Sequence, residues 1–361
     1  MNRKTLIALA AGSAALAAPA AASAALAYVT TPRNIKTQPY LMVANDDGSG
    51  ARAIAPAMDA AISPDGGMVA YMSNSESSDT GFATSLVELA TNTTVSLGTA
   101  CVSTPVWSPN SRTLACQTQS ANARGFVTGN GLGTYSVPTS LAGLTSLAIT
   151  NFIAPRGNGV DYSMAFSPDS LSIAYAWKTY TSRALPSLYV APLANAAARV
   201  RVLARAGGPV WGSVGIAAGQ QRNVRVRLGG SMVRTVQSQV WVVQPDGTGA
   251  RRITRYRATG LTAGPFATAW APAGNLLAGG IGGEDQQDLA VINVANGGVR
   301  ILRRGQLNDP VAFSLDGQRI LFSTGVEGGT QSIRTIGVNG RSARVLVRQG
   351  RNPSVSAGWN G

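Results

Sequence analysis

The sequence predicts an all-β protein built from repeated four-stranded antiparallel units, and three observations support this prediction. An apolar or aromatic residue followed by Ser-Pro-Asp recurs along the chain, with its fullest copy at residues 166–169. A second phrase, Asp-Gly or Asn-Gly shortly before Ala-Arg, lies between copies of the first. Short runs of alternating apolar and polar residues flank both phrases, which is the pattern of half-buried strands.

The first phrase predicts a strand, a tight turn and a second strand. Ser, Pro and Asp at successive positions are what a type I turn favours, because Pro presets φ near −65°. The residues that lead the six copies, of which the fourth is degenerate, are Ile62, Trp107, Phe166, Trp211, Trp270 and Phe313. They are 45, 59, 45, 59 and 43 residues apart. A period in the forties with strand-length pieces is typical of β-propeller blades.

The second phrase predicts the hairpin that completes each unit. Its copies are at residues 47–52, 246–251 and 339–344, after expected strands at 40–44, 240–244 and 332–338. Asp-Gly and Asn-Gly between such runs are strong hairpin signals, because the turn needs positive φ. One unit is therefore an inner strand, the Ser-Pro-Asp turn, two further strands, the Asp-Gly turn and an outer strand.

These two alternating phrases resemble those of the TolB-type, WD-repeat-like β-propeller family. The resemblance covers residues 38–361 and does not extend to the α/β domain that precedes the propeller in TolB. It implies a propeller fold. Propellers of this kind serve as binding scaffolds, as accessory domains of enzymes and sometimes as enzymes, so the family alone does not assign a function.

The N-terminus predicts a secretory signal peptide over residues 1–27. A basic start is followed by an apolar run from Leu6 to Ala18, a Pro and small-residue sites, which favour cleavage after Ala24 or Ala27. An uncleaved membrane anchor is the alternative. Residues 28–38 are interpreted as a polar lead and residues 39–361 as a single propeller domain. The expected location is the periplasm or the extracellular space, with no transmembrane segment after cleavage.

The ends of the chain favour seven blades over six. Six inner phrases require at least six blades, yet strands at 40–44 and 51–55 precede the first of them. Residues 355–361 resemble one more inner strand, since Trp359 follows Phe313 by 46 residues. N- and C-terminal strands sharing one blade would close the ring and remove open sheet edges.

Two insertions account for the longer intervals between repeats. One spans residues 119–150, and the other spans residues 218–238 and carries four arginines. Alternation from Asn223 to Leu228, followed by Gly229-Gly230, indicates a long hairpin in the second. Insertions in propellers often lie on the binding face, although neutral drift in a tolerant loop explains them equally well.

Positive charge is concentrated in the second half of the chain. From Arg199 onward there are 20 Arg and no Lys against 7 acidic residues, within a total net charge of +14. A basic surface of this kind attracts anionic polymers, and a solvated surface without a partner is the alternative. Aromatic or fold-specific readers of nucleic acid are absent, so specific nucleic acid recognition is not expected.

Only two cysteines are present, Cys101 and Cys116, on either side of the turn at residues 107–111. Folding about that turn places them roughly opposite each other. In an exported protein this spacing predicts a disulfide that staples one hairpin and has no catalytic role.

The chain contains no histidine. Ser-His-Asp and Cys-His catalytic groups and imidazole metal ligands are therefore excluded. We predict no catalytic residues and no organic cofactor. Carboxylates are the remaining candidates: Asp59, Asp161 and Asp309 precede three inner phrases, where the chain enters the mouth of the central channel. They are candidate ligands for calcium or for a cationic group, although the sequence favours the alternative that each one caps its own loop.

A second acidic group comprises Glu284, Asp285 and Asp288, and a solvated turn explains it better than a metal site. The aromatic residues that lead the repeats are expected in the core between blades. The sequence favours an exported, monomeric, non-catalytic binding or protein-interaction scaffold whose partner is a protein or an anionic polymer of the cell envelope. The alternative is a carboxylate-based, possibly calcium-dependent, propeller enzyme acting on carbohydrate.

Overall fold

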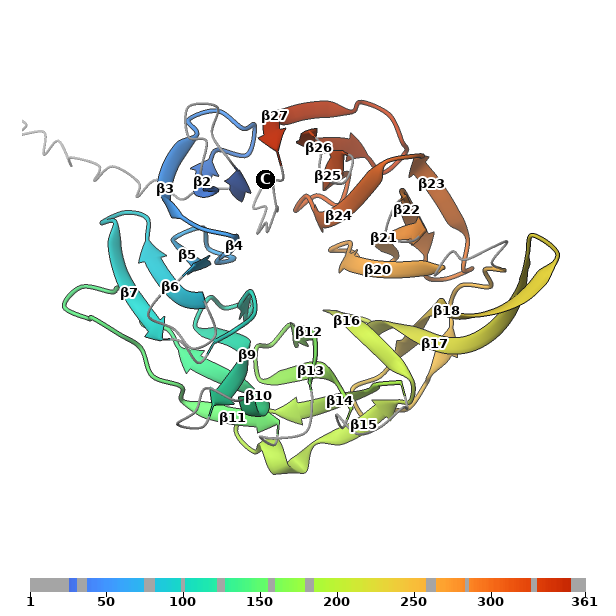
Figure 1. The fold of residues 1–361 in the computed structure, drawn as a ribbon, viewed down its shortest axis with the longest axis horizontal. Helices are drawn as coiled ribbons and strands as arrows, with labels where there is room; N and C mark the ends of the chain where they lie inside the picture. The colour runs from blue at the N-terminus through green and yellow to red at the C-terminus, as the bar shows by residue number, and fades with distance from the viewer. Residues whose placement is uncertain are drawn as a thin grey trace, which may run out of the picture.

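Successive antiparallel sheets stand around a common centre, with the first strand of each unit innermost (Figure 1). The computed structural model describes residues 26–30, 38–74, 82–98, 101–121, 127–154, 160–178, 185–257, 264–282, 286–325 and 330–351. Within these ranges all regular structure is β-strand, apart from the short 3₁₀ turn η1 (Ala196–Ala198). The all-β class and the four-stranded antiparallel units predicted from the repeats are confirmed.

The first half of the described chain forms four sheets. The first has three strands, β1 (Leu26–Thr30), β2 (Tyr40–Ala44) and β3 (Arg52–Pro56). The second contains β4 (Asp59–Ile62), β5 (Met68–Asn74), β6 (Phe82–Glu88) and β7 (Thr93–Gly98). The third contains β8 (Val106–Trp107), β9 (Thr113–Ala121), β10 (Val127–Ser136) and β11 (Asn151–Ala154). The fourth contains β12 (Val160–Phe166), β13 (Ser172–Trp177), β14 (Ser187–Pro192) and β15 (Val200–Leu203).

Three further four-stranded units follow in the same order. The first contains β16 (Ala206–Gly212), β17 (Gly215–Leu228), β18 (Ser231–Val243) and β19 (Arg251–Arg252). The next contains β20 (Pro265–Trp270), β21 (Leu276–Gly282), β22 (Gln287–Asn293) and β23 (Val299–Arg303). The last contains β24 (Leu307–Phe313), β25 (Arg319–Gly325), β26 (Thr330–Gly337) and β27 (Arg344–Arg351). One parallel bridge, Gln287 to Leu307, joins these last two units into a single hydrogen-bonded sheet.

Hydrogen bonds within the Ser-Pro-Asp turn explain why the phrase recurs. At the last copy, the Ser314 hydroxyl donates to Asp316 Oδ1 and accepts from the backbone N–H of Arg319. Asp316 Oδ1 in turn accepts the backbone N–H of Gln318 at 2.9 Å. The same contacts recur in the turns at Ser63, Ser108 and Ser167. In these four copies the Ser and Asp or Asn side chains therefore satisfy backbone donors that the reversal exposes.

The apolar core lies between neighbouring sheets. Phe313 and Leu289 pack in one such layer, and Trp107 packs in another. Indole N–H groups bond across the layers, from Trp107 Nε1 to the carbonyl of Ala61 and from Trp270 Nε1 to that of Val210, both at 2.9 Å. The aromatic residues that lead the repeats are thus structural, as their positions on inner strands indicated.

The first sheet also packs against the last unit. Leu26, Tyr28 and Ala44 form one apolar cluster with Leu321 and Ile333, so side chains from both ends of the described chain share a core. Strand β1 lies between two core layers and all five of its residues are buried: Leu26 and Tyr28 belong to this cluster, and Ala27 and Val29 belong to the cluster shared with the second sheet. Tyr28–Thr30, which were expected in a polar lead, therefore form the end of a buried strand.

Two terminal predictions lie outside the described residues. One is the signal peptide up to residue 25, and the other is the C-terminal inner strand at residues 355–361. The three strands β1, β2 and β3 pair in the order expected for the second, third and outer strands of a blade. Seven blades, closed by strands from both termini, stay a prediction.

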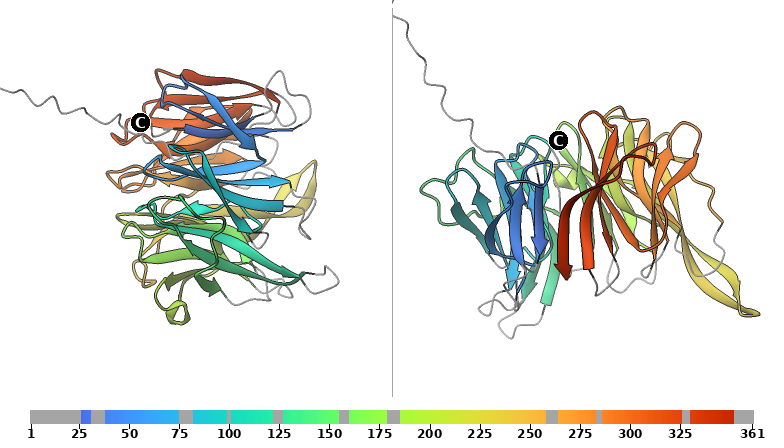
Figure 2. Two further views of the ribbon diagram at one scale, coloured as in Figure 1. Left: turned by 90° about the vertical axis from the view of Figure 1, so that its left-hand side faces the viewer. Right: turned by 90° about the horizontal axis from the view of Figure 1, so that it is seen from above.

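The two insertions have different structures. Residues 137–150 of the first fold back on strand β7: Leu141 is fully buried, and the backbone N–H of Leu147 donates to the carbonyl of Ser96. Residues 218–238 of the second extend β17 and β18 into a hairpin that projects from the ring (Figure 1, Figure 2). The first insertion is therefore part of the packed structure, and the second forms the hairpin predicted from its alternation.

Candidate functional site

The three predicted carboxylates all lie on inner strands. Asp59 is the first residue of β4, Asp161 lies in β12 and Asp309 lies in β24. Asp59 accepts hydrogen bonds from the hydroxyl of Thr104 and from the backbone N–H of Ala60. Asp309 Oδ1 accepts one from Gln287 Nε2 at 2.7 Å. Thus Asp59 and Asp309 have local partners, and the side chain of Asp161 lies outside the described residues.

Within the described parts of the chain, no three acidic, histidine or cysteine residues lie close enough together to hold a metal ion. Of the other acidic group, Glu284 and Asp285 lie outside those parts. Asp288 forms an ion pair with Arg304 at 3.6 Å and accepts the backbone N–H of Gly305 at 2.9 Å. The calcium site at the channel mouth stays a prediction.

The structure joins Cys101 to Cys116, whose Cα atoms are 5.7 Å apart, a separation that a disulfide spans. Both cysteines are fully buried in one apolar cluster, and Cys101 bridges to Thr118 on β9. The disulfide therefore ties the segment before β8 to β9. This position inside the core gives the pair a structural role.

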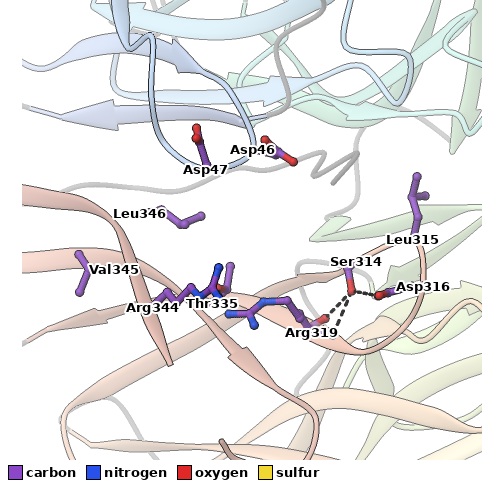
Figure 3. Close-up of a pocket in the computed structure, with 10 residues that line it drawn as sticks. All are labelled: Asp46, Asp47, Ser314, Leu315, Asp316, Arg319, Thr335, Arg344, Val345 and Leu346. Carbon is purple, nitrogen blue, oxygen red and sulfur yellow. Dashed lines mark hydrogen bonds between the residues drawn. The ribbon is translucent and has the colours of Figure 1, made fainter. Parts of the chain in front are cut away.

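A pocket of about 510 Å³ lies where the first sheet meets the last unit (Figure 3). It is lined by Asp46, Asp47, Ser314, Leu315, Asp316, Arg319, Thr335, Arg344, Val345 and Leu346. The two acidic residues of the β2–β3 turn face the side chains of the last unit across it. We call it the junction pocket.

Three charged side chains that line the junction pocket, those of Arg319, Asp47 and Asp316, form hydrogen bonds with other groups of the protein. Arg319 donates to the hydroxyl of Thr335 and to the carbonyl of Ser342. Hydrogen bonds from Ser49 lower the pKa of Asp47, and those from the Ser314 turn lower the pKa of Asp316. These contacts hold the turns in place, so the pocket is best explained as part of the contact between the chain's ends.

The hairpin of β17 and β18 is the longest pair of strands in the described structure. Its register runs without interruption from Ile216 opposite Val243 to Leu228 opposite Ser231. Gln237 and the residues of β18 that follow it lie largely within the blade, since most of them are buried. Beyond that point the two strands leave the ring (Figure 2). We call residues 223–236 the hairpin extension.

The two faces of the hairpin extension differ in character. Arg225, Arg227 and Arg234 share one exposed face, and Arg225 stands directly opposite Arg234. Val224, Val226, Val233 and Thr235 alternate with them and form the other, half-buried face. Like charges directly opposite each other destabilise a strand pair, so the arginine pair has a cost that local structure does not offset.

No acidic partner balances these arginines in the part of the chain that is described, where the ion pair found joins Arg304 to Asp288. A hollow of about 330 Å³ lies beside the arginine pair, lined by Asn223, Val224, Arg225, Arg234, Thr235 and Val236. The hairpin extension therefore combines unpaired positive charge, a hollow and an apolar face. Sequence reasoning found the hairpin and its arginines, but not the separation of its faces.

The architecture defines the protein as a β-propeller, and solved structures share this fold. No protein-family model matches the chain, and no curated protein matches it in sequence. TolB from Acinetobacter baumannii superimposes with a TM-score of 0.53 at 17% identity, over 94% of this chain and 68% of that one. The resemblance to TolB-type propellers is thus confirmed at the level of the fold.

Two other propellers are similar to an equal degree. The β-propeller domain of the Trilobed protease from Pyrococcus furiosus gives a TM-score of 0.57 at 11% identity, over 90% of this chain and 99% of that domain. An oligogalacturonate lyase in complex with manganese gives 0.57 at 13% identity, over 90% and 85%. The chain spans about half the length of the prolyl endopeptidases that it also matches. At such identities the likeness concerns the fold alone.

Proposed function

We propose that this protein is an exported β-propeller that acts as a non-catalytic binding scaffold in the cell envelope or outside the cell. The observation that carries the proposal is the hairpin extension, which leaves the ring with Arg225, Arg227 and Arg234 exposed on one face. A two-stranded ribbon is marginally stable in water without a sheet or a helix to pack on, so a partner explains its length and its charge.

The tripartite N-terminus supports export, and no helix in the described chain is long and apolar enough to cross a membrane. The remaining blades serve as the rigid frame that holds the hairpin extension away from the ring. Binding residues often lie on an insertion of a rigid scaffold, because the scaffold stabilises the fold and the insertion is free to contact a partner.

Deletion of the hairpin extension tests this proposal. Arg222 and Gln237 stand directly opposite each other, so replacing residues 223–236 by Asn-Gly closes the strands with a two-residue turn. We expect the native host to export and process both chains, and the shortened chain to be lost from the envelope fraction while its thermal unfolding is unchanged. Equal retention of both chains, or failure to export the full chain, would refute the proposal.

A carboxylate-based enzyme acting on carbohydrate is the second candidate. It is favoured by the position of Asp59, Asp161 and Asp309 on three inner strands, and by the shared fold of an oligogalacturonate lyase that was solved with manganese. Calcium or manganese should then raise the melting temperature of the mature chain, and replacement of all three residues by Asn should remove that shift. No shift in the unmodified chain would exclude the candidate.

A further inference from the structure

We propose that the hairpin extension docks on an anionic lipid bilayer, with its valine face at the acyl boundary and its arginines among the headgroup phosphates. This inference rests on the proposed function and names the partner of the same surface. It follows from the two faces of the extension, from its unpaired charge and from its position beyond the ring.

The charge of the extension favours an anionic partner. Arg225 and Arg234 are opposite neighbours, and Arg227 lies two residues further along the same face. All three are exposed, and within the described residues none forms an ion pair. Guanidinium groups bind phosphate with two parallel hydrogen bonds, so an anionic partner removes the repulsion between the pair. The hollow of about 330 Å³ beside the pair offers room for a headgroup.

The apolar face of the extension favours a bilayer over a soluble polyanion. A polyanion accounts for the arginine face but leaves Val224, Val226 and Val233 in water. A bilayer supplies both partners at the correct depth, because an amphipathic element at its surface buries its apolar face about 5–10 Å into the headgroup boundary. The opposite, cationic face then lies at the level of the phosphates. Met232, which is 58% exposed, stands opposite Arg227 on the arginine face and is not part of this apolar face.

The position of the extension makes it accessible to a flat surface. In the right-hand view of Figure 2 the extension runs outward beyond the neighbouring blades, so a flat surface that approaches from that side meets it before the ring. Its register continues unbroken from the buried part of the blade. The blade therefore fixes the direction in which both faces are presented.

Flotation of the mature full-length chain with vesicles tests the inference. Vesicles of phosphatidylcholine containing phosphatidylglycerol should bind the chain, and vesicles of phosphatidylcholine alone should not. Replacing Arg225, Arg227 and Arg234 by Gln should weaken partitioning about fivefold for each residue and about a hundredfold together. The matched control replaces three exposed arginines outside the hairpin, Arg201, Arg341 and Arg344, and should leave binding nearly unchanged.

The valine face has its own test. Replacing Val224, Val226 and Val233 by Ser keeps the charge and should weaken binding at least tenfold. A Val233→Trp variant, with the new side chain on the valine face, should show a blue shift of its fluorescence with anionic vesicles and none with neutral ones. Melting temperatures of all variants should match that of the unmodified chain, because the substitutions lie outside the ring.

Three results would overturn the inference. The first is equal binding to neutral and anionic vesicles, and the second is an equal loss of vesicle binding in the arginine variant and in its control. The third is vesicle binding that depends on the arginines but not on the valines. The last result, with competition by soluble polyglutamate, would assign the surface to an anionic polymer. A fourth result, envelope retention that needs the extension together with no vesicle binding, would also overturn the bilayer but would leave the binding scaffold standing.

Discussion

Two serines in left-handed backbone provide a sharp test of how neighbouring blades are joined. Ser111 and Ser170 have φ of 58° and 63°, whereas glycine occupies the same turn position at Gly66, Gly274 and Gly317. The Ser111 hydroxyl accepts the backbone N–H of Asp65 in the preceding blade at 3.0 Å. Ser170 accepts that of Asn110 in the same way at 3.1 Å. We infer that the bond between blades offsets the backbone strain.

The magnitudes separate Ala from Gly at these positions. A hydrogen bond of this kind contributes about 1 kcal/mol, and a non-glycine residue in left-handed backbone costs about 1–2 kcal/mol. Ser111→Ala loses the bond and keeps the strain, so it should destabilise by about 1 kcal/mol. Ser111→Gly loses the bond but releases the strain, so its stability should stay within about 0.5 kcal/mol of the original. Applying each change at both serines should roughly double the difference.

Equilibrium urea unfolding, followed by tryptophan fluorescence, measures these differences. The double Ala variant should unfold at a clearly lower urea concentration than the double Gly variant, with the same slope. If Ala and Gly destabilise equally, the strain argument is wrong. If the Ala variant is as stable as the unmodified chain, the hydrogen bond between blades contributes nothing to stability and the reasoning is refuted.

Three further predictions concern the N-terminus, the turns and the disulfide. A mature chain that begins at Tyr28 lacks two fully buried residues of β1, so it should be about 2–4 kcal/mol less stable than one that begins at Ala25, as measured by denaturant unfolding. The pKa of Asp316 is lowered chiefly by the Ser314 hydroxyl, so its stabilising effect is present above its usual pKa and lost as pH falls below about 4. Asp316→Asn should therefore flatten the acid limb of a melting-temperature profile, since Asn110 occupies the equivalent position in another turn. Cys101→Ser opens a disulfide with a sequence separation of 15 and should cost about 3 kcal/mol, and a reducing agent should lower the melting temperature of the unmodified chain but not of the variant.

The two insertions show why a sequence interval alone does not locate a binding surface. Both lengthen the repeat from about 45 to 59 residues. In the first, Leu141 is fully buried and Glu88 accepts its backbone N–H, so the segment supports the neighbouring blade. The second projects with exposed arginines. Burial against β7 distinguishes them, and burial is a property of the folded chain.

The sequence determined the architecture because that information is local. Ser-Pro-Asp and Asp-Gly specify turns through φ preferences and through hydrogen bonds that span a few residues, as the Ser314–Asp316 contact shows. Their alternation specifies the order of strands, and the alternation after Asn223 specified the hairpin. These features depend on neighbours in the chain, so they can be predicted without knowing the packing.

Only the tertiary structure decided which residues meet across long distances. It placed β1 in a core with Leu321 and Ile333, which are nearly 300 residues away. Residues 26–30 contain neither of the repeated phrases, so the sequence did not predict this contact. It also set Arg225 opposite Arg234, with Val224, Val226 and Val233 on the other face. Strand pairing sets the register, and a shift of one residue exchanges the faces. Sequence composition therefore located the positive charge, and the register determined what that charge can bind.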